Sequence, residues 1–192
     1  MAVSLSARRE WSQSFSWSAI RWPVMVMGIL ILVFLCAWFA GFRINATPSE
    51  PVGIWRMEPV TSPIRVGEFV SFCAPTPDFP FLQPGDCLNG VAPFLKEVVG
   101  GPGDRIQESA EGVWINGRHL PESRPLAKAV GYAVHLPQWR GSIRLRRGQY
   151  WVYGGGWPSL SYDSRYWGPV SRARIRSVAR PVWVTAAHLW LP

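Results

Sequence analysis

The sequence has no run of Lys and Arg that would form a nucleic-acid-binding segment, no zinc-finger spacing and no aromatic RNA-binding motif. Lys and Arg total 20 against 12 Asp and Glu, and most of the basic residues are arginines scattered along the chain. A basic balance indicates nucleic acid or an acidic membrane surface mainly when the charges gather in one segment. The sequence therefore argues against nucleic acid as a partner.

Cysteine and histidine are scarce, with three of each. None of them stands at the spacing of a metal-ligand set, so we expect no metal and no other cofactor. Cys36 falls within an apolar run and is expected to pack there, whereas Cys73 and Cys87 fall later in the chain. In an oxidising compartment that second pair can form a disulfide, and the alternative is two unpaired thiols.

Long amphipathic helices are also missing from most of the chain, because 18 Pro and 18 Gly residues divide it into short runs. The Asn116-Gly117 pair joins two of these runs and is a strong hairpin signal. Residues 117–141 have irregular polarity and are expected to form an inserted loop or a small subdomain. The spacing predicts a mainly β fold with an antiparallel, barrel-like domain. The expected strands are 68–73, 95–99, 104–107, 112–115, 142–146, 150–153, 174–178 and 181–185.

One apolar run, residues 22–42, carries no charge and is long enough to span a bilayer as a helix. Arginines outnumber acidic residues before it, so the positive-inside rule places residues 1–21 in the cytoplasm. Residues 43–192 then form an exported domain, in a periplasm or its equivalent. A cleavable signal peptide is the alternative, but the run is longer than a usual signal core. We therefore expect a retained single-pass anchor in a bacterial inner membrane.

A single lysine, Lys96, interrupts the apolar strand-like run that begins at Phe94. Side chains alternate along a strand, so Phe94, Lys96 and Val98 share one face. Burial disfavours the charged form of a lysine, and a neutral lysine can act as a general base that activates a serine. The alternative is that Lys96 extends its ammonium group to solvent.

Ser49 lies between two prolines shortly after the apolar run. Pro48 and Pro51 are expected to hold this segment extended, because a residue before proline avoids helical geometry. Taken alone, a serine in such a setting is an ordinary loop residue.

Three segments together resemble the signal peptidase I superfamily of serine–lysine peptidases: residues 45–53, 95–104 and 161–170. Their order and their position just after a membrane anchor also match that family. The first segment reads Asn-x-Thr-x-Ser-x-Pro-x-Gly, which resembles the conjugative-transfer branch, the TraF-type peptidases that process a pilin precursor. The resemblance implies a signal-peptidase-type β domain after the anchor. The pair Cys73 and Cys87 also fits that branch.

The resemblance implies a catalytic dyad. Ser49 matches the nucleophile, and Lys96 matches its general base. Thr47 matches a position whose hydroxyl helps the backbone N–H of Ser49 to bind the oxyanion.

The third segment supplies supporting residues by the same resemblance. Ser161 matches a serine that orients the lysine amine, and Asp163 and Arg165 match an acidic and a basic member. In the conjugative branch the aspartate takes part in catalysis, whereas in signal peptidases it pairs structurally with the arginine. The sequence leaves both roles open for Asp163.

The resemblance implies a membrane-anchored serine endopeptidase that matures an exported precursor, such as a conjugative pilin, with or without cyclisation of the product. Its partners would be a membrane-bound precursor, the inner membrane and other proteins of a transfer apparatus. One alternative is a general leader peptidase, and another is a non-catalytic scaffold of a transfer or secretion apparatus. A self-cleaving repressor with the same dyad is disfavoured by the anchor and by the absence of a DNA-binding helix pair.

Overall fold

The protein is described here by a computed structural model, which covers residues 17–77 and 79–185. Most of the predicted cytoplasmic segment, residues 1–16, and the last residues, 186–192, lie outside the described part. The chain divides after Phe39 into two compact units, and in the described residues the first contains one long helix and the second contains the strands.

The first unit is the helix α1, Trp17–Phe39. Its stretch Ile20–Phe39 has a mean hydropathy of 2.4 and is long and apolar enough to cross a membrane. One such N-terminal helix suggests a single-pass membrane anchor. The helix ends before Phe42, the predicted end of the anchor, because Gly41 takes a φ of +87° and Phe42 begins a strand. Glycine at positive φ is a common end of a helix.

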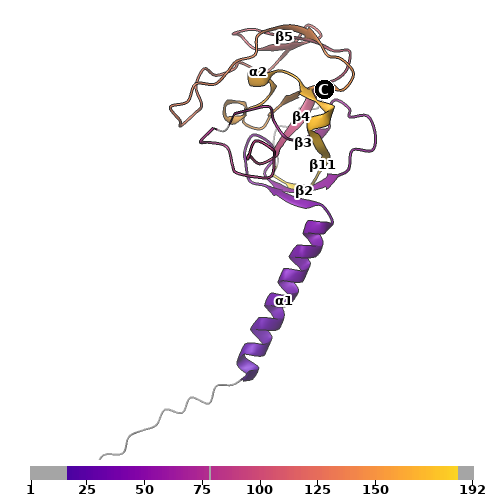
Figure 1. Ribbon diagram of the computed structural model, residues 1–192, viewed down its shortest axis with the longest axis vertical. Coiled ribbons are helices and arrows are strands. Elements are labelled where there is room, and N and C mark those ends of the chain that lie inside the picture. Colours follow the sequence, from indigo (N-terminus) through magenta and orange to yellow (C-terminus); the bar gives the residue numbers. More distant parts are fainter. Residues whose placement is uncertain (1–16, 78, 186–192) are drawn as a thin grey trace, which may run out of the picture. The chain divides into compact units, whose positions relative to one another are not determined.

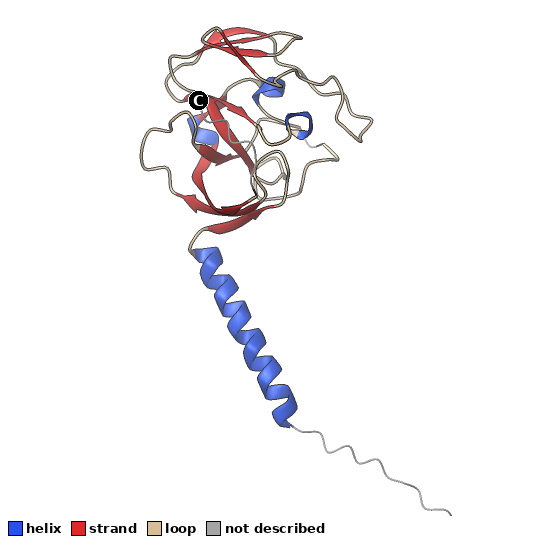
Figure 2. Cartoon of the chain, turned by 180° about the vertical axis from the view of Figure 1, so that it is seen from behind, coloured by secondary structure: helices blue, strands red, loops and turns tan. Residues whose placement is uncertain are grey.

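The second unit is built from two antiparallel sheets, which lie toward opposite ends of that unit (Figures 1 and 2). The larger sheet has the order β1-β2-β11-β3-β4-β9-β10, and the smaller has the order β7-β6-β5-β8. The expectation of a mainly β, antiparallel domain is confirmed. Within the described residues the larger sheet stays open, with β1 and β10 at its edges, so no closed barrel forms. Its strands are β1 (Phe42–Asn45), β2 (Gly53–Glu58), β3 (Phe69–Phe72), β4 (Phe94–Gly100), β9 (Gln149–Tyr153), β10 (Val170–Ser171) and β11 (Ile175–Val184).

The smaller sheet contains β5 (Arg105–Glu108), β6 (Val113–Ile115), β7 (Arg118–Leu120) and β8 (Gly141–Arg144). Asn116 and Gly117 have φ values of 52° and 82° at the β6–β7 turn, as a two-residue primed turn requires. The predicted insertion 117–141 contains β7 and ends at the first residue of β8, so both of its ends belong to this sheet. Among its described residues the unit also has three short helices: η1 (Pro158–Leu160), α2 (Ser164–Trp167) and η2 (Arg172–Arg174).

Strand β4 lies inside the larger sheet, between β3 and β9. Phe94 and Val98 pack into one core cluster, whereas Leu95 packs into another on the opposite face. This is the alternation that the sequence predicts. Lys96 shares the face of Val98 and is only 3% exposed, so the sheet holds a lysine in its interior.

Two local expectations are wrong. The segment around Ser49 is not extended, because Pro48 and Ser49 form a turn between the paired strands β1 and β2. The separate runs 174–178 and 181–185 are one strand, β11, whose register shifts between Pro181 and Trp183 where it pairs with β2. The sequence analysis also did not predict β1 and β2, which flank that turn.

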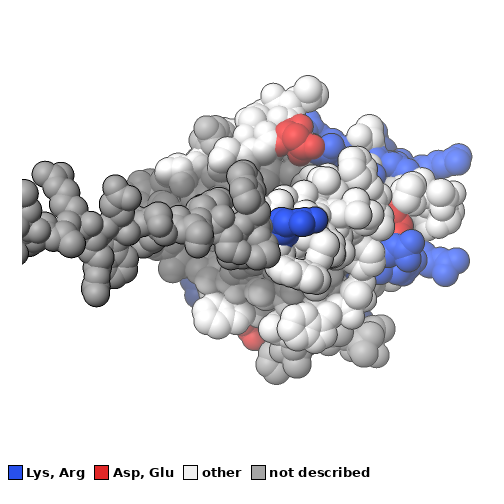
Figure 3. Space-filling model, turned by 90° about the horizontal axis from the view of Figure 1, so that it is seen from below, with Lys and Arg blue, Asp and Glu red and all other residues white. Residues whose placement is uncertain are grey.

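The chain has more basic than acidic residues, and Lys and Arg side chains are visible on the described surface seen from below (Figure 3). They stand in separate groups there rather than in one continuous field. This distribution agrees with arginines that are scattered along the sequence.

Candidate active site

Residues 46–52, called here the β1–β2 turn, carry Ser49. The side chain of Asn45, at the end of β1, holds this turn from both sides of the serine. Its Nδ2 donates to the backbone carbonyls of Thr47 at 3.0 Å, Glu50 at 3.2 Å and Pro51 at 3.1 Å. The half-buried amide of Asn45 therefore defines the path of the chain around Ser49.

Two glycines that follow β9 pack closely against the same turn. The N–H of Gly156 donates to the carbonyl of Ser49 at 3.1 Å. A Cβ added at Gly156 would lie 2.6 Å from the carbonyl oxygen of Pro48, and one at Gly154 would lie 2.0 Å from Oγ of Ser161. Only glycine fits at these two positions, so the backbone after β9 brings the β1–β2 turn up to the third segment of the sequence motif.

Lys96 reaches the β1–β2 turn from β4. Its Nζ lies 2.6 Å from Oγ of Ser49, and Ser49 itself is only 7% exposed. Burial lowers the pKa of Lys96, while the carboxyl groups of Glu50 and Asp163 oppose that shift and Arg165 adds to it. A buried amine with a lowered pKa can accept the hydroxyl proton of Ser49.

Two buried acids next to this pair were missed by the sequence analysis. Glu50 is 2% exposed and Glu97 is 8% exposed. The backbone N–H of Glu97 donates to Oε1 of Glu50 at 3.3 Å. Burial raises the pKa of Glu50 to about 8 and that of Glu97 to about 7. Neither acid has a sequence signal of its own, because a glutamate normally faces solvent.

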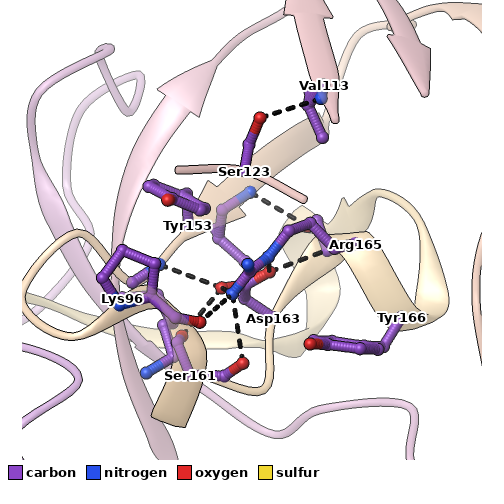
Figure 4. Close-up of polar contacts among 12 residues, drawn as sticks. Lys96, Val113, Ser123, Tyr153, Ser161, Asp163, Arg165 and Tyr166 are labelled. Atoms are coloured by element: carbon purple, nitrogen blue, oxygen red, sulfur yellow. Dashed lines mark hydrogen bonds and ion pairs between the residues drawn. The ribbon is translucent and has the colours of Figure 1, made fainter. Parts of the chain in front are cut away.

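The third motif segment forms a buried ion pair between Asp163 and Arg165, whose side chains are both 0% exposed. Nε of Arg165 donates to Oδ1 of Asp163 at 2.8 Å, and Nη2 donates to Oδ2 at 2.9 Å (Figure 4). Oδ2 also accepts from Oγ of Ser161 at 2.7 Å and from the N–H of Gly154 at 3.1 Å. The carboxylate of Asp163 is therefore fully occupied within the protein.

Arg165 extends this network to other parts of the unit. It donates to the carbonyl of Pro158 at 2.7 Å and to that of Arg124, in the segment between β7 and β8, at 3.4 Å. Its guanidinium also lies over the rings of Tyr153, at 4.9 Å, and Tyr166, at 5.4 Å. These contacts connect β9 of the larger sheet to η1 and to the segment between β7 and β8, so Arg165 has the geometry of a structural centre.

The structure brings the predicted site residues together in two groups. Ser49 and Lys96 contact each other, while Ser161 joins the Asp163–Arg165 pair. Among the hydrogen bonds of the described residues, Ser161 bonds through its hydroxyl to Asp163 and not to Lys96. The implied role of Ser161 in orienting the lysine is therefore indirect in this arrangement.

The oxyanion donors implied by the resemblance lie on the β1–β2 turn. Thr47 is exposed, and its hydroxyl donates to Oδ1 of Asn45 at 2.7 Å. In the described part of the chain no acceptor is bonded to the backbone N–H of Ser49. That N–H can serve an oxyanion directly, whereas the Thr47 hydroxyl would have to rotate away from Asn45.

A disulfide joins Cys73, just after β3, to Cys87, with a Cα–Cα distance of 5.6 Å. The loop that it closes carries Phe79 and Phe81, whose rings each lie 5.7 Å from that of Tyr162. Since Tyr162 stands next to Ser161 in the chain, the disulfide loop packs against the third motif segment.

Comparisons with known proteins found a matching family model, curated relatives and a solved structure. Residues 14–184 match the family model described as signal peptidase, peptidase S26. The chain is 37% identical to the conjugal transfer protein TraF of Agrobacterium tumefaciens over 150 residues, covering 74% of this chain and 82% of that protein. It is 29% identical to the plasmid transfer protein TraF of Escherichia coli over 167 residues, covering 83% and 92%. A crystal structure of a signal peptidase I from Enterococcus faecalis V583 aligns with a TM-score of 0.37 and 24% identity, over 62% of this chain and 97% of that one.

Proposed function

The chain belongs to the signal peptidase family, peptidase S26, and is of the TraF type, and from this premise we propose that it is a membrane-anchored serine endopeptidase. Ser49 is its nucleophile and Lys96 its general base. The family suggests a serine peptidase that acts on a precursor, and the TraF relatives suggest conjugative transfer as the context.

The observation that carries this proposal is the 2.6 Å contact between Nζ of Lys96 and Oγ of Ser49 in a site where both residues are buried. A serine hydroxyl is a weak nucleophile near neutral pH and needs an adjacent base. The lowered pKa of Lys96 supplies that base, because a neutral amine can take the proton. A scaffold role gives no reason for a lysine to be buried against a serine.

The reaction follows from these groups. Lys96 accepts the Oγ proton as Ser49 attacks the scissile carbonyl carbon, and the negative charge collects on the carbonyl oxygen. The backbone N–H of Ser49, with the hydroxyl of Thr47 after rotation, binds that oxyanion. The C–N bond then breaks as the ammonium of Lys96 gives its proton to the leaving amine. An ester on Ser49 remains, and Lys96 is again neutral.

The second half of the reaction decides the product. Attack by water on the ester releases a linear acid, and Lys96 takes the proton of the water and returns one to Ser49. Attack by the amino terminus of the same substrate instead forms a peptide bond and releases a cyclic product, which is one water lighter than the linear product. We propose that the substrate is an exported, membrane-bound precursor such as a conjugative pilin, and that the β unit lies on the periplasmic side of the inner membrane.

The test is conversion of a precursor in cells. The full chain is co-expressed with small membrane-inserted pilin precursors, and product masses are measured by mass spectrometry. Ser49→Ala and Lys96→Met should each abolish conversion while the protein still accumulates in the membrane. Lys128→Met is the matched control, because Lys128 is exposed and lies outside the site, and it should process as the natural chain does.

The outcomes separate the alternatives. Loss of conversion in Ser49→Ala and Lys96→Met but not in Lys128→Met supports the dyad. The product mass of the natural chain then distinguishes hydrolysis from cyclisation. Processing of unrelated exported precursors to linear products would favour a general leader peptidase. Conversion that persists in Ser49→Ala, or no conversion of any precursor by the natural chain, would contradict the proposal and favour a scaffold.

A further inference from the structure

Glu50 is a buried acid next to the proposed nucleophile, and the mechanism above does not use it. It is 2% exposed, and its Oε1 accepts the backbone N–H of Glu97, the residue after Lys96, at 3.3 Å. Its own carbonyl is held by Asn45 at 3.2 Å. The carboxyl group is therefore held against β4, one residue beyond the proposed base.

The charges of a few described residues act on this acid and on the proposed base. The groups whose charge acts on Lys96 are Glu50, Asp163 and Arg165, in decreasing order. Those that act on Glu50 are Lys96, then Glu97 and Asp163. Asp163 is already neutralised by its ion pair with Arg165. This leaves Glu50 as the buried acid whose protonation changes the charge near the base.

Resting on the proposed function, we infer that Glu50 is a positioning residue whose buried carboxyl group acts on Lys96 through its charge, so that the two buried side chains titrate as one unit. When Glu50 is ionised it favours the ammonium form of Lys96, and when Glu50 is protonated the amine is free to act as a base. Two groups coupled in this way lose their protons in two steps that belong to the pair rather than to either residue. Glu50 thereby sets the pH at which Lys96 becomes active.

The sign of the effect follows. A negative charge near a lysine raises the pKa of that lysine, so removing the charge lowers it. Glu50→Gln keeps the size and the acceptor oxygen of the side chain but cannot ionise. In that variant Lys96 should lose its proton in a single step, with a midpoint about one pH unit or more below that of the natural chain.

The chain offers a direct measurement, because Lys96 and Lys128 are its only lysines. Isotope-labelled lysine gives two side-chain NMR signals in the full-length protein in detergent micelles, and the exposed Lys128 supplies the reference signal. The natural chain should show a two-step titration at Lys96 and Glu50→Gln a single step at lower pH. Glu97→Gln is the matched control, since it also removes a buried acid close in sequence to Lys96, and it should keep both steps.

A titration of Lys96 that is identical in the natural chain and Glu50→Gln would overturn the inference. So would a single-step curve in the natural chain, a result that does not depend on the variant folding. The NMR titration needs no substrate, so it can succeed even if the proposed peptidase activity fails. Where cleavage is found, the acidic limb of the pH–rate profile should shift in Glu50→Gln together with the titration midpoint of Lys96. A limb that does not shift would contradict the role of Glu50 but not the proposed peptidase activity.

Discussion

The buried pair of Asp163 and Arg165 allows a quantitative test of its structural role. Replacing Arg165 by Met removes the partner of a carboxylate that is 0% exposed and leaves its charge in the interior. Breaking a buried ion pair in this way typically costs about 3–5 kcal/mol of unfolding free energy. The carbonyls of Pro158 and Arg124 also lose a donor, so we expect the upper part of that range.

The assay is thermal and denaturant unfolding of the full chain in detergent micelles, followed by circular dichroism. For a chain of this size the expected loss corresponds to a fall in Tm of roughly 6–20 °C. Arg180→Met is the matched control, because Arg180 pairs with Glu58 while its own side chain stays 57% exposed. Exposed pairs contribute only about 0–1 kcal/mol.

A double variant separates charge from shape. Arg165→Met combined with Asp163→Asn leaves no buried charge, so it should be more stable than Arg165→Met alone. The reasoning is refuted if Arg165→Met unfolds like the Arg180→Met control, or if the double variant is no more stable than the single one. In either case the pair would not be the structural centre that its contacts indicate.

Three further predictions concern other parts of the unit. Because the pKa of Lys96 is lowered in the folded protein, the unfolded chain, in which the pKa of lysine is ~10.4, binds the proton more readily. Lys96→Met should therefore keep or raise the free energy of unfolding at neutral pH, and the gain should disappear as pH rises toward ~10.4 in denaturant titrations. Marked destabilisation would instead identify Lys96 as a charged structural lysine. Replacing Cys73 and Cys87 by Ala opens a loop with a sequence separation of 14 and should lower the free energy of unfolding by about 3 kcal/mol. Chemical reduction of the disulfide in the natural chain should have the same effect. An unchanged unfolding midpoint would refute this prediction. Gly156→Ala should displace the β1–β2 turn and lower the cleavage rate at least about tenfold. Gly155→Ala is the control and should leave the rate unchanged, because a Cβ at Gly155 would meet open space. Equal rates in the two variants would argue against the packing of Gly156 on the turn.

Several features followed from the sequence alone because each depends on local chemistry. An uncharged apolar run predicts a helix, and short alternating runs between Pro and Gly predict strands, whatever the rest of the chain does. The Asn116-Gly117 turn was predicted for the same reason, since those residues tolerate positive φ. The family resemblance rested on three motif segments, and the comparisons confirm it.

Other features depended on which segments meet. The sequence analysis described Ser49 as part of an extended segment, but pairing of β1 with β2 makes its surroundings a turn. Nothing local marks Glu50 as buried, because its burial comes from β4, far along the chain. Likewise, only the packing of the backbone after β9 against the β1–β2 turn shows why Gly154 and Gly156 must be glycine. Sequence patterns determined the types of element and the candidate chemistry, while the tertiary structure decided burial, and burial controls the protonation of Lys96 and Glu50.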